Sequence, residues 1–360
     1  MNKTDLKSIG LTERFIQEAQ SYNSFNIGRV ASQSKDLYQV ITETGVLRAE
    51  ISGKLRHEAR TLSVYPAVGD FVLVDRTDNS EGNGIIHHIL TRKSIFARKV
   101  AGATEDLQIV AANIDTVFIC MALNNDFNLR RMERYLSIAW DSRATPVVVL
   151  TKADLCADLD TRLNELSSIA IGVETLITTC ASEYGYFSVK KYISPGQTVA
   201  FIGSSGVGKS TLINRLLGGE ILETKETRSD DKGRHTTTRR ELIVLPEGGV
   251  VIDTPGMREL GVVRADLERT FADLDELAAK CRFRDCAHEK EPGCAVQEAV
   301  CAGILSAERL ESYRKIKKEA NYSGLNSRQI EQEKLNRLFG GVGGIKNARK
   351  FMREKNRKKR

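Results

Sequence analysis

The segment GSSGVGKS, residues 203–210, constrains the fold of this chain more than any other feature. It matches the pattern G-x-x-x-x-G-K-S/T, and it stands between an apolar run, TVAFI, and a helical run, TLINRLL. Glycines in such a loop let backbone N–H groups close around phosphate oxygens, and the following helix adds the positive end of its dipole. A chance glycine-rich turn needs neither neighbour, so the context predicts a phosphate-binding loop.

Two residues at the end of this loop carry expected chemistry. Lys209 is placed to reach the β and γ phosphates of a nucleotide, and the Ser210 hydroxyl is placed to bind Mg²⁺. A second loop, Asp253-Thr254-Pro255-Gly256, follows the apolar run GVVI and begins 44 residues after Lys209. A D-x-x-G pattern alone is usually a turn. After a phosphate loop it indicates that Asp253 holds Mg²⁺ through water and that Gly256 offers its N–H to the γ phosphate.

The tetrapeptide Thr151-Lys152-Ala153-Asp154 follows a buried strand pattern and matches the N/T-K-x-D loop that reads guanine. An aspartate accepts hydrogen bonds from the ring N–H and the exocyclic amine of guanine, while the Lys152 stem packs along the base. Downstream, Ala181 ends another strand pattern and can offer its backbone N–H to the guanine oxygen. The alternatives are a strand-to-helix turn capped by Asp154 and an adenine-binding site.

The order of these loops along the chain is unusual. The base-reading loops precede the phosphate loop, whereas most GTP-binding domains have the opposite order. Joining the old termini and opening the chain elsewhere keeps every strand neighbour, and folds tolerate this where the termini lie close together. We therefore predict a circularly permuted α/β domain with a mostly parallel sheet.

The polar segment KETRSDDKGRHTTTRREL, residues 225–242, lies between the phosphate loop and Asp253. We expect Thr238, or Thr237 beside it, to bind Mg²⁺ as a switch threonine; a β-hairpin with ordinary threonine content is the alternative. Met257 stands where many GTPases have a water-orienting glutamine, so His235 is our candidate for positioning the attacking water. A solvated loop histidine is an equally good interpretation of His235.

Periodicity divides the chain into four parts. Residues 1–104 contain a short helix and five strand patterns between 28 and 90, which favour an OB-like barrel, although an SH3-like barrel has the same periodicity. Residues 105–265 alternate strands with helices, which is typical of an α/β domain. Residues 266–338 are helical and contain a Cys/His cluster, and residues 339–360 form a basic tail.

The Cys/His cluster reads Cys281-x4-Cys286-x-His288-x5-Cys294. Three thiolates and one imidazole complete a tetrahedral Zn²⁺ site with no open position, so we predict a structural metal rather than an unmetallated group of thiols. Glu289 or Glu291 can orient the imidazole, and the sequence does not choose between them. We expect the remaining nearby thiol, Cys301, to be a buried helix residue.

Charge and apolar patterning bear on partners and location. The net charge is +7, yet nine Lys or Arg residues and one acid lie between Gly341 and Arg360, which leaves about −1 for the rest of the chain. Such a tail favours a polyanionic partner, or is simply a solvated terminus. The first residues lack the apolar core of a secretion signal, and no run of 18 apolar residues occurs, so we expect a cytoplasmic protein.

The chain resembles the ribosome small subunit-dependent GTPase A family over nearly its whole length. The resemblance is carried by the permuted loop order and by the segments GRHTTT, DTPG and CRFRDCAHEKEPGCAV. The resemblance implies an OB-fold domain, one Zn²⁺, and GTP hydrolysis to GDP and phosphate that the 30S subunit stimulates late in its maturation. It implies that Thr151, Lys152 and Asp154 bind guanine. It also implies that the phosphates are bound by Gly203, Ser204, Ser205, Gly206, Val207, Gly208, Lys209, Ser210 and Thr211. It implies in addition that zinc is bound by Cys281, Cys286, His288 and Cys294.

The sequence departs from the family pattern at two positions, both mildly. Thr151 stands where Asn is common, and Cys180 stands where Ser is often found.

We expect 30S rRNA as the partner, no membrane or DNA partner, and a monomer. The main alternative is a permuted GTPase that acts on a non-ribosomal RNA or protein. A nucleic-acid-binding module without turnover and an ATP-dependent enzyme are weaker rivals, since Lys209, Ser210, Asp253 and Asp154 are all in place.

Overall fold

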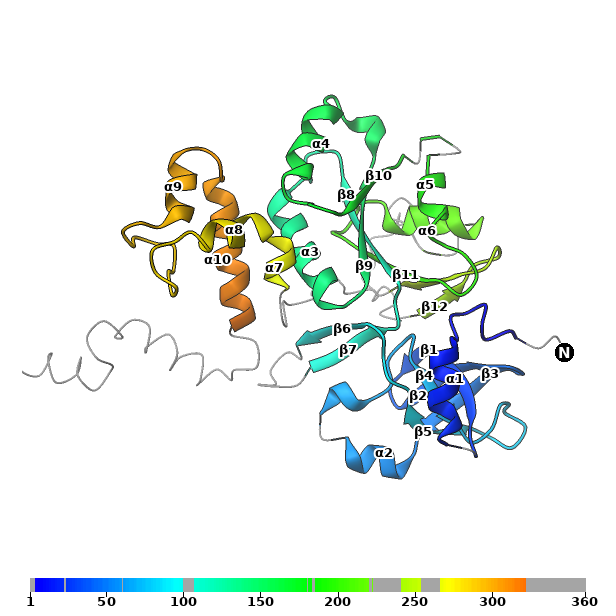
Figure 1. The fold of residues 1–360 in the computed structure, drawn as a ribbon. Coiled ribbons are helices and arrows are strands. Elements are labelled where there is room, and N and C mark those ends of the chain that lie inside the picture. Colours follow the sequence, from blue (N-terminus) through cyan, green and yellow to red (C-terminus); the bar gives the residue numbers. More distant parts are fainter. Residues whose placement is uncertain are drawn as a thin grey trace, which may run out of the picture.

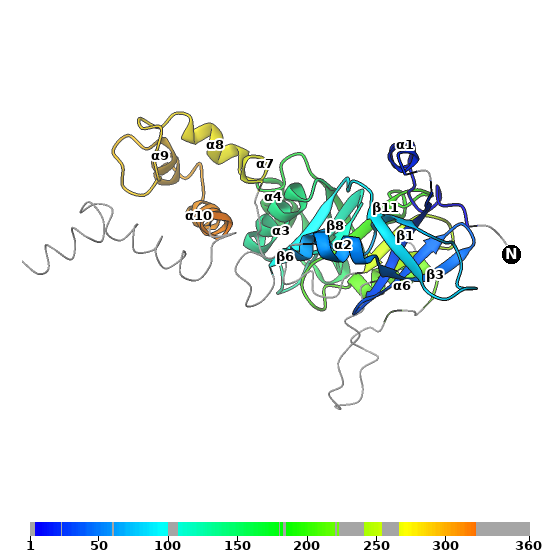
Figure 2. The same ribbon diagram turned by 90° about the horizontal axis from the view of Figure 1, so that it is seen from below.

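The computed structural model of the chain contains a strand-rich N-terminal part, a central sheet flanked by helices, and a C-terminal group of helices (Figure 1). The structure describes residues 4–22, 24–59, 61–99, 107–179, 181–182, 185–219, 222, 241–253 and 266–321. Both views place the C-terminal helices on one side of the central sheet, away from the N-terminal strands (Figures 1 and 2). Among the helices in these ranges, none combines the length and the apolar character needed to cross a bilayer.

The N-terminal part is a closed barrel of five strands. They are β1 (Asn26–Ser34), β2 (Leu37–Thr42), β3 (Gly45–Ile51), β4 (Phe71–Val74) and β5 (Gly84–Ile89). The order β1-β2-β3-β5-β4 closes through a pairing of β4 with β1. The expected alternation holds in β2, where Tyr38 and Val40 are buried while Gln39 is exposed, but not around Val72 and Val74, because all four residues of β4 are buried. Helix α2 (Gly53–Glu58) and the short helix η1 (Leu62–Val64) separate β3 from β4, and Phe15 of α1 (Glu13–Gln20) packs on Phe71.

A two-stranded hairpin connects the barrel to the central sheet. Strands β6 (Ile95–Lys99) and β7 (Leu107–Ala112) pair antiparallel with each other and with no strand of the main sheet in the described residues. The proposed boundary between residues 104 and 105 falls in the connection of this hairpin and stays a prediction.

The central sheet has the strand order β10-β9-β8-β11-β13-β12. Its strands are β8 (Thr116–Ala122), β9 (Thr145–Thr151), β10 (Glu174–Ile177), β11 (Thr198–Ile202), β12 (Glu241–Val244) and β13 (Val250–Asp253). Adjacent strands from β10 to β13 pair in parallel, and β12 pairs antiparallel with β13. Strand β11, which leads into the phosphate loop, therefore lies beside β8, which comes far earlier in the chain.

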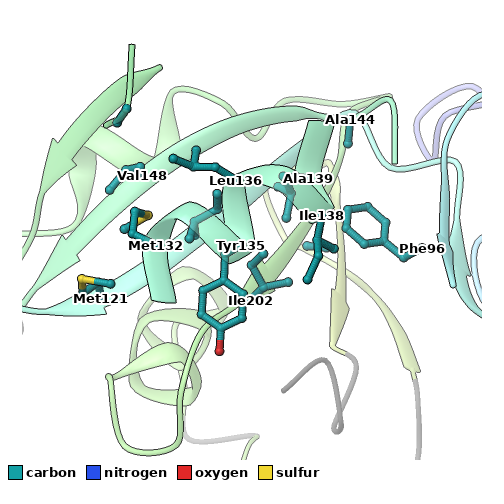
Figure 3. Close-up of a cluster of buried hydrophobic side chains, with 14 of the residues drawn as sticks. Phe96, Met121, Met132, Tyr135, Leu136, Ile138, Ala139, Ala144, Val148 and Ile202 are labelled. Atoms are coloured by element: carbon teal, nitrogen blue, oxygen red, sulfur yellow. The ribbon is translucent and has the colours of Figure 1, made fainter. Parts of the chain in front are cut away.

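Alternation along these strands divides the core between two faces. Ile119 and Ile202 belong to the cluster that contains helix α3 (Leu129–Asp141), whereas Cys120 and Phe201 face α5 (Phe187–Lys190) and α6 (Lys209–Leu217). Helix α4 (Leu159–Ser167) packs on the α3 side through Leu166. Figure 3 shows the first cluster, in which Met132, Tyr135, Leu136 and Ala139 of α3 lie over the sheet residues Met121, Val148 and Ile202.

The C-terminal helices attach to α3 by one buried and one partly exposed ion pair. They are α7 (Leu267–Thr270), α8 (Ala272–Ala278), α9 (Ala295–Cys301) and α10 (Ala307–Asn321). The Arg309 guanidinium lies 2.8 Å from the carboxylate of Glu133 on α3 and 2.6 Å from that of Asp273 on α8. Nearer the end of α10, Glu319 pairs with Arg134 of α3. One helix of the central domain therefore holds most of the C-terminal group in place.

The barrel meets the central domain around one fully buried side chain, Arg29 of β1. Its guanidinium donates to the carbonyls of Ile9, Gly69 and Asn113 and to the hydroxyl of Thr198, the first residue of β11. Burial lowers the pKa of Arg29 to about 10, and the charges of Asp115 and Asp70 act against this. Gly69 has φ +92°, and a Cβ there would lie 2.2 Å from the Ala112 carbonyl oxygen, so only glycine permits this close approach.

We predict that Arg29→Met destabilises the protein by about 3 to 5 kcal/mol, because it leaves several buried acceptors without a donor. Chemical unfolding followed by intrinsic fluorescence measures the loss. The control is Arg14→Met, since Arg14 is exposed and donates to a single carbonyl, that of Thr91; it should change stability by less than about 0.5 kcal/mol. Equal losses in the two variants would contradict the role given to Arg29.

Candidate nucleotide-binding site and metal centre

The predicted nucleotide-binding loops meet at one edge of the central sheet. Strands β8, β9 and β11 are parallel neighbours, so the loops that follow them leave the sheet at the same edge. In α/β sheets ligands bind at this carboxyl edge, where the strand order reverses direction. The reversal lies between β8 and β11, directly below the phosphate loop.

The phosphate loop has the backbone that its glycines predict. Gly203, Gly206 and Gly208 have φ values of +148°, +77° and +99°. A Cβ on Gly203 would lie 2.4 Å from the carbonyl oxygen of Cys120 in β8, so the close approach of these strands requires glycine. The Lys209 ammonium donates to the carbonyls of Gly203 and Ser204, at 2.8 and 2.7 Å. Ser210 and Thr211 lie in the first turn of α6.

Asp253 ends β13, one parallel strand away from the phosphate loop. Burial raises the pKa of its carboxyl above the usual range, the charge of Lys209 opposes this, and that of Glu241 adds to it. A carboxylate whose charge is poorly solvated gains from a nearby cation, which is the environment expected of a residue that faces Mg²⁺.

The two base-reading loops contact each other through a threonine. Asp154 is exposed in the short helix η2 (Ala153–Leu155), and the Thr179 hydroxyl donates to its carboxylate. The same hydroxyl accepts the backbone N–H of Ala181 at 3.0 Å. The structure thus brings together the two groups predicted to read guanine. Sequence reasoning missed Thr179, whose only signal was its place two residues before Ala181.

The first residue of the base-reading motif connects the two halves of the site. Thr151 is buried, and its hydroxyl donates to the carbonyl of Val207 in the phosphate loop at 2.5 Å. Lys152 next to it has φ +56°, which turns the chain sharply out of β9. A threonine in place of the common asparagine therefore still ties the base-reading loop to the phosphate loop.

A second contact to the phosphate loop was not predicted. Asp126, in the loop after β8, accepts the Ser204 hydroxyl at 2.5 Å and the Arg131 guanidinium at 2.8 Å. The hydrogen bonds from Ser204 and Arg131 hold the pKa of the Asp126 carboxyl below its usual range. The segment Asn124–Asn128 matches no phosphate-binding pattern, so the sequence offered no signal for this contact.

Several predicted residues lie outside the described ranges. These are His235, Thr237 and Thr238 of the switch segment, Gly256 and Met257 after Asp253, Cys180 in the second base-reading loop, and the basic tail. Their roles stay predictions.

The four Cys/His ligand atoms lie within 4.8 Å of one another. His288 directs Nδ1 toward the thiols, 3.6 Å from Cys281 Sγ and 3.5 Å from Cys294 Sγ. Cys294 caps α9, and its sulfur accepts the backbone N–H of Gln297. A compact Cys₃His set is compatible with Zn²⁺.

The surroundings of the cluster favour the ligand forms of His288 and Cys281, whereas burial raises the pKa of the Cys286 thiol to about 11. Burial lowers the pKa of His288, the charge of Lys317 lowers it further, and the charge of Glu291 opposes this, so a neutral imidazole is favoured. Burial acts to raise the pKa of Cys281, but hydrogen bonds from the backbone N–H groups of Val296 and Ala295 and from the neighbouring thiols together outweigh it. A helix N-terminus stabilises a thiolate in this way.

Two expectations about neighbouring residues are refined. The Glu291 carboxylate accepts the backbone N–H groups of residues 287, 289 and 290, so it orders the turn that carries His288. Cys301 is exposed at the end of α9, and our expectation that it is buried is wrong. It faces away from the apolar stripe that Val296 and Ala299 bury, which a short helix pattern did not resolve.

Fold and loop order together define a circularly permuted GTPase with an N-terminal barrel, and known proteins agree. The structure of YjeQ from Thermotoga maritima superposes with a TM-score of 0.60 at 28% identity, covering 82% of this chain and 98% of that one. The structure of YloQ, described as a circularly permuted GTPase, has a TM-score of 0.57 at 24% identity and covers 82% and 95%. At that identity it supports the fold alone.

Sequence comparison identifies the family. The sequence model of the RsgA GTPase family matches residues 89–263. Small ribosomal subunit biogenesis GTPase RsgA 2 of Lactiplantibacillus plantarum is 51% identical over 343 residues, which cover 95% of this chain and 97% of that protein. RsgA 1 of Listeria innocua is 44% identical and covers 88% and 90%. The chain belongs to the RsgA GTPase family and is a GTP hydrolase, which confirms the resemblance found in the sequence.

Proposed function

We propose that this protein binds the small (30S) ribosomal subunit and hydrolyses GTP in response to it late in 30S maturation. The bond from Thr151 to the Val207 carbonyl, which joins base reading to phosphate binding at one sheet edge, carries the nucleotide part of the proposal. The ribosomal part is supported by the near-full-length relative, which is named for biogenesis of the small subunit.

The proposed nucleotide site belongs to a P-loop domain with a mostly parallel sheet, residues 105–265. In it Asp154 and the Ala181 N–H read guanine, Lys152 packs along the base, and residues 203–211 bind the phosphates. Ser210 and Thr238 bind Mg²⁺, with Asp253 acting through water and the Gly256 N–H facing the γ phosphate. Lys209 stabilises charge on the transferred phosphoryl group, and His235 positions the attacking water.

The barrel, residues 1–104, is proposed to be an OB-fold that contacts rRNA. Its strand order β1-β2-β3-β5-β4, closed by β4 against β1, supports this assignment over an SH3-like barrel. The basic tail, residues 339–360, adds charge that favours an RNA backbone. We propose a cytoplasmic monomer that uses neither DNA nor a membrane as its partner.

The Cys/His cluster in the helical domain, residues 266–338, is proposed to hold one structural Zn²⁺. Cys281, Cys286, His288 and Cys294 would be its ligands, and the full set leaves no position for a reacting group. The metal would supply the cross-link that holds the loop of residues 281–294 to the start of α9.

We predict that purified 30S subunits raise the GTP turnover of the protein at least about tenfold, because the subunit orders the hydrolytic residues. A tenfold rise corresponds to an activation free energy lower by roughly 1.4 kcal/mol. Phosphate release with and without subunits measures the effect, and 50S subunits are the control. Turnover that 30S subunits leave unchanged would refute the ribosomal partner and would leave the nucleotide assignment standing. Stimulation by another RNA or protein would then favour the alternative partner class.

We predict that Asp154→Asn weakens GTP binding by about 100-fold, because the substitution removes the carboxylate and with it two charge-assisted hydrogen bonds to guanine. ATP binding should change little, so the preference for guanine narrows. Competition of GTP and ATP against a fluorescent GDP analogue measures both affinities. The control is Asp160→Asn, an exposed aspartate in the first turn of α4. An unchanged ratio of GTP to ATP affinity would contradict the role of Asp154.

We predict that the protein contains one Zn²⁺ per chain and that Cys281→Ser abolishes this content. The helical domain should then lose its cooperative unfolding transition, because metal binding and folding are coupled in such sites. Elemental analysis and calorimetry are the measurements. Cys301→Ser is the matched control, since Cys301 is exposed and outside the cluster. Retention of zinc by Cys281→Ser would exclude Cys281 as a ligand.

A further inference from the structure

We propose that Asp126, together with Arg131, is a positioning residue of the nucleotide site that sets the geometry of the phosphate loop through Ser204. The inference rests on the proposed nucleotide site and adds to it a contact from outside every recognised motif. Asp126 does not touch the nucleotide in this proposal. It acts through Ser204, the second residue of the loop.

The elements around Asp126 hold its carboxylate in place. The Asn124 side chain accepts the Asp126 backbone N–H at 3.0 Å, and the Asn128 side chain caps α3 by accepting the Arg131 N–H at 3.0 Å. Asp126 and Arg131 thus lie on either side of a helix start that is fixed by capping. The Arg131 guanidinium also donates to the Ser204 hydroxyl oxygen at 3.1 Å, so the three side chains form a closed triangle.

Ser204 transmits this contact to the phosphate-binding lysine. Its hydroxyl is held by Asp126, while its own carbonyl accepts the Lys209 ammonium at 2.7 Å. A shift of Ser204 therefore moves an acceptor that fixes Lys209. On the other side of the loop, the Thr151 hydroxyl holds the Val207 carbonyl. Side chains therefore hydrogen-bond to the phosphate loop near both of its ends, and Asp126 makes the contact nearer to Gly203.

The exposure of these side chains indicates that the contact of Asp126 and Arg131 with Ser204 contributes to nucleotide binding rather than to folding stability. The side chains of Asp126 and Arg131 are 38% and 32% exposed, and ion pairs so open to water contribute little to folding. The charge on the carboxylate is nevertheless favoured, because the hydrogen bonds from Ser204 and Arg131 lower its pKa and the charge of Lys152 acts in the same direction.

The test compares Asp126→Ala, Ser204→Ala, their double variant and Asp126→Asn, with fluorescent GDP and GTP analogues and no ribosomal subunits present. Asp126→Ala should weaken binding of both nucleotides about tenfold, the loss of one charge-assisted hydrogen bond. Ser204→Ala should show a similar loss, and the double variant no further loss, because both changes remove one contact. Asp126→Asn keeps an acceptor for Ser204 and should lose about threefold.

Thermal unfolding of the nucleotide-free protein separates positioning from a merely structural role. All four variants should unfold within about 2 °C of the parent, as for other exposed pairs. The matched control is Asp78→Ala, which removes a Ser80–Asp78 hydrogen bond of the same 2.5 Å length in the barrel and should leave nucleotide affinity unchanged.

Affinities within twofold of the parent for Asp126→Ala would overturn the proposal, as would losses for Asp126→Ala and Ser204→Ala that multiply in the double variant. A fall in unfolding temperature with unchanged affinity would show a structural role and would also overturn it. If Asp126→Ala does not fold, Asp126→Asn decides by the same criteria. Because no subunits are used, the result is independent of whether the ribosome is the partner.

Discussion

The buried guanidinium of Arg29 is the contact on which the arrangement of this molecule depends. It donates to acceptors from four separate parts of the chain, at Ile9, Gly69, Asn113 and Thr198. A charged group without water needs every such partner, because an unpaired buried charge is very costly. Thr198 begins β11, the strand that leads into the phosphate loop. The contact that orients the barrel therefore also fixes the start of this strand. A single pairing of Ser32 with Glu241 joins the two sheets as well.

Helix α3 connects the nucleotide site to the C-terminal helices in a similar way. Its first turn places Arg131 against Asp126 and Ser204, and its next residues, Glu133 and Arg134, pair with Arg309 and Glu319 of α10. The permuted order has a mechanical consequence here. The chain leaves Asp253 and returns to described structure at α7, which packs on α3. The phosphate loop and the C-terminal helices are therefore attached to the same rigid element.

The predicted loops and the Cys/His cluster were accessible from the sequence because their chemistry is local. Gly203, Gly208 and Lys209 must be near one another in the chain to enclose a phosphate, and Cys281 to Cys294 must be close in sequence to form so short a knot. Asp126 and Arg29 had no such signal. Each acts on a partner far along the chain, and ordinary residues of these types are common on surfaces. The error at Cys301 has a related cause, since a helix of two turns defines its buried face poorly.

Residue patterns were sufficient to predict the barrel strands, the alternation of strands and helices and the permuted loop order, because periodicity and motif spacing reflect backbone geometry within one element or turn. Folding alone decided which elements meet. It placed β11 between β8 and β13, so that Asp126 and Thr151 reach opposite ends of one loop. It also buried Arg29 where four segments converge. Such contacts join residues whose separation along the chain is large, and local sequence carries no record of that proximity.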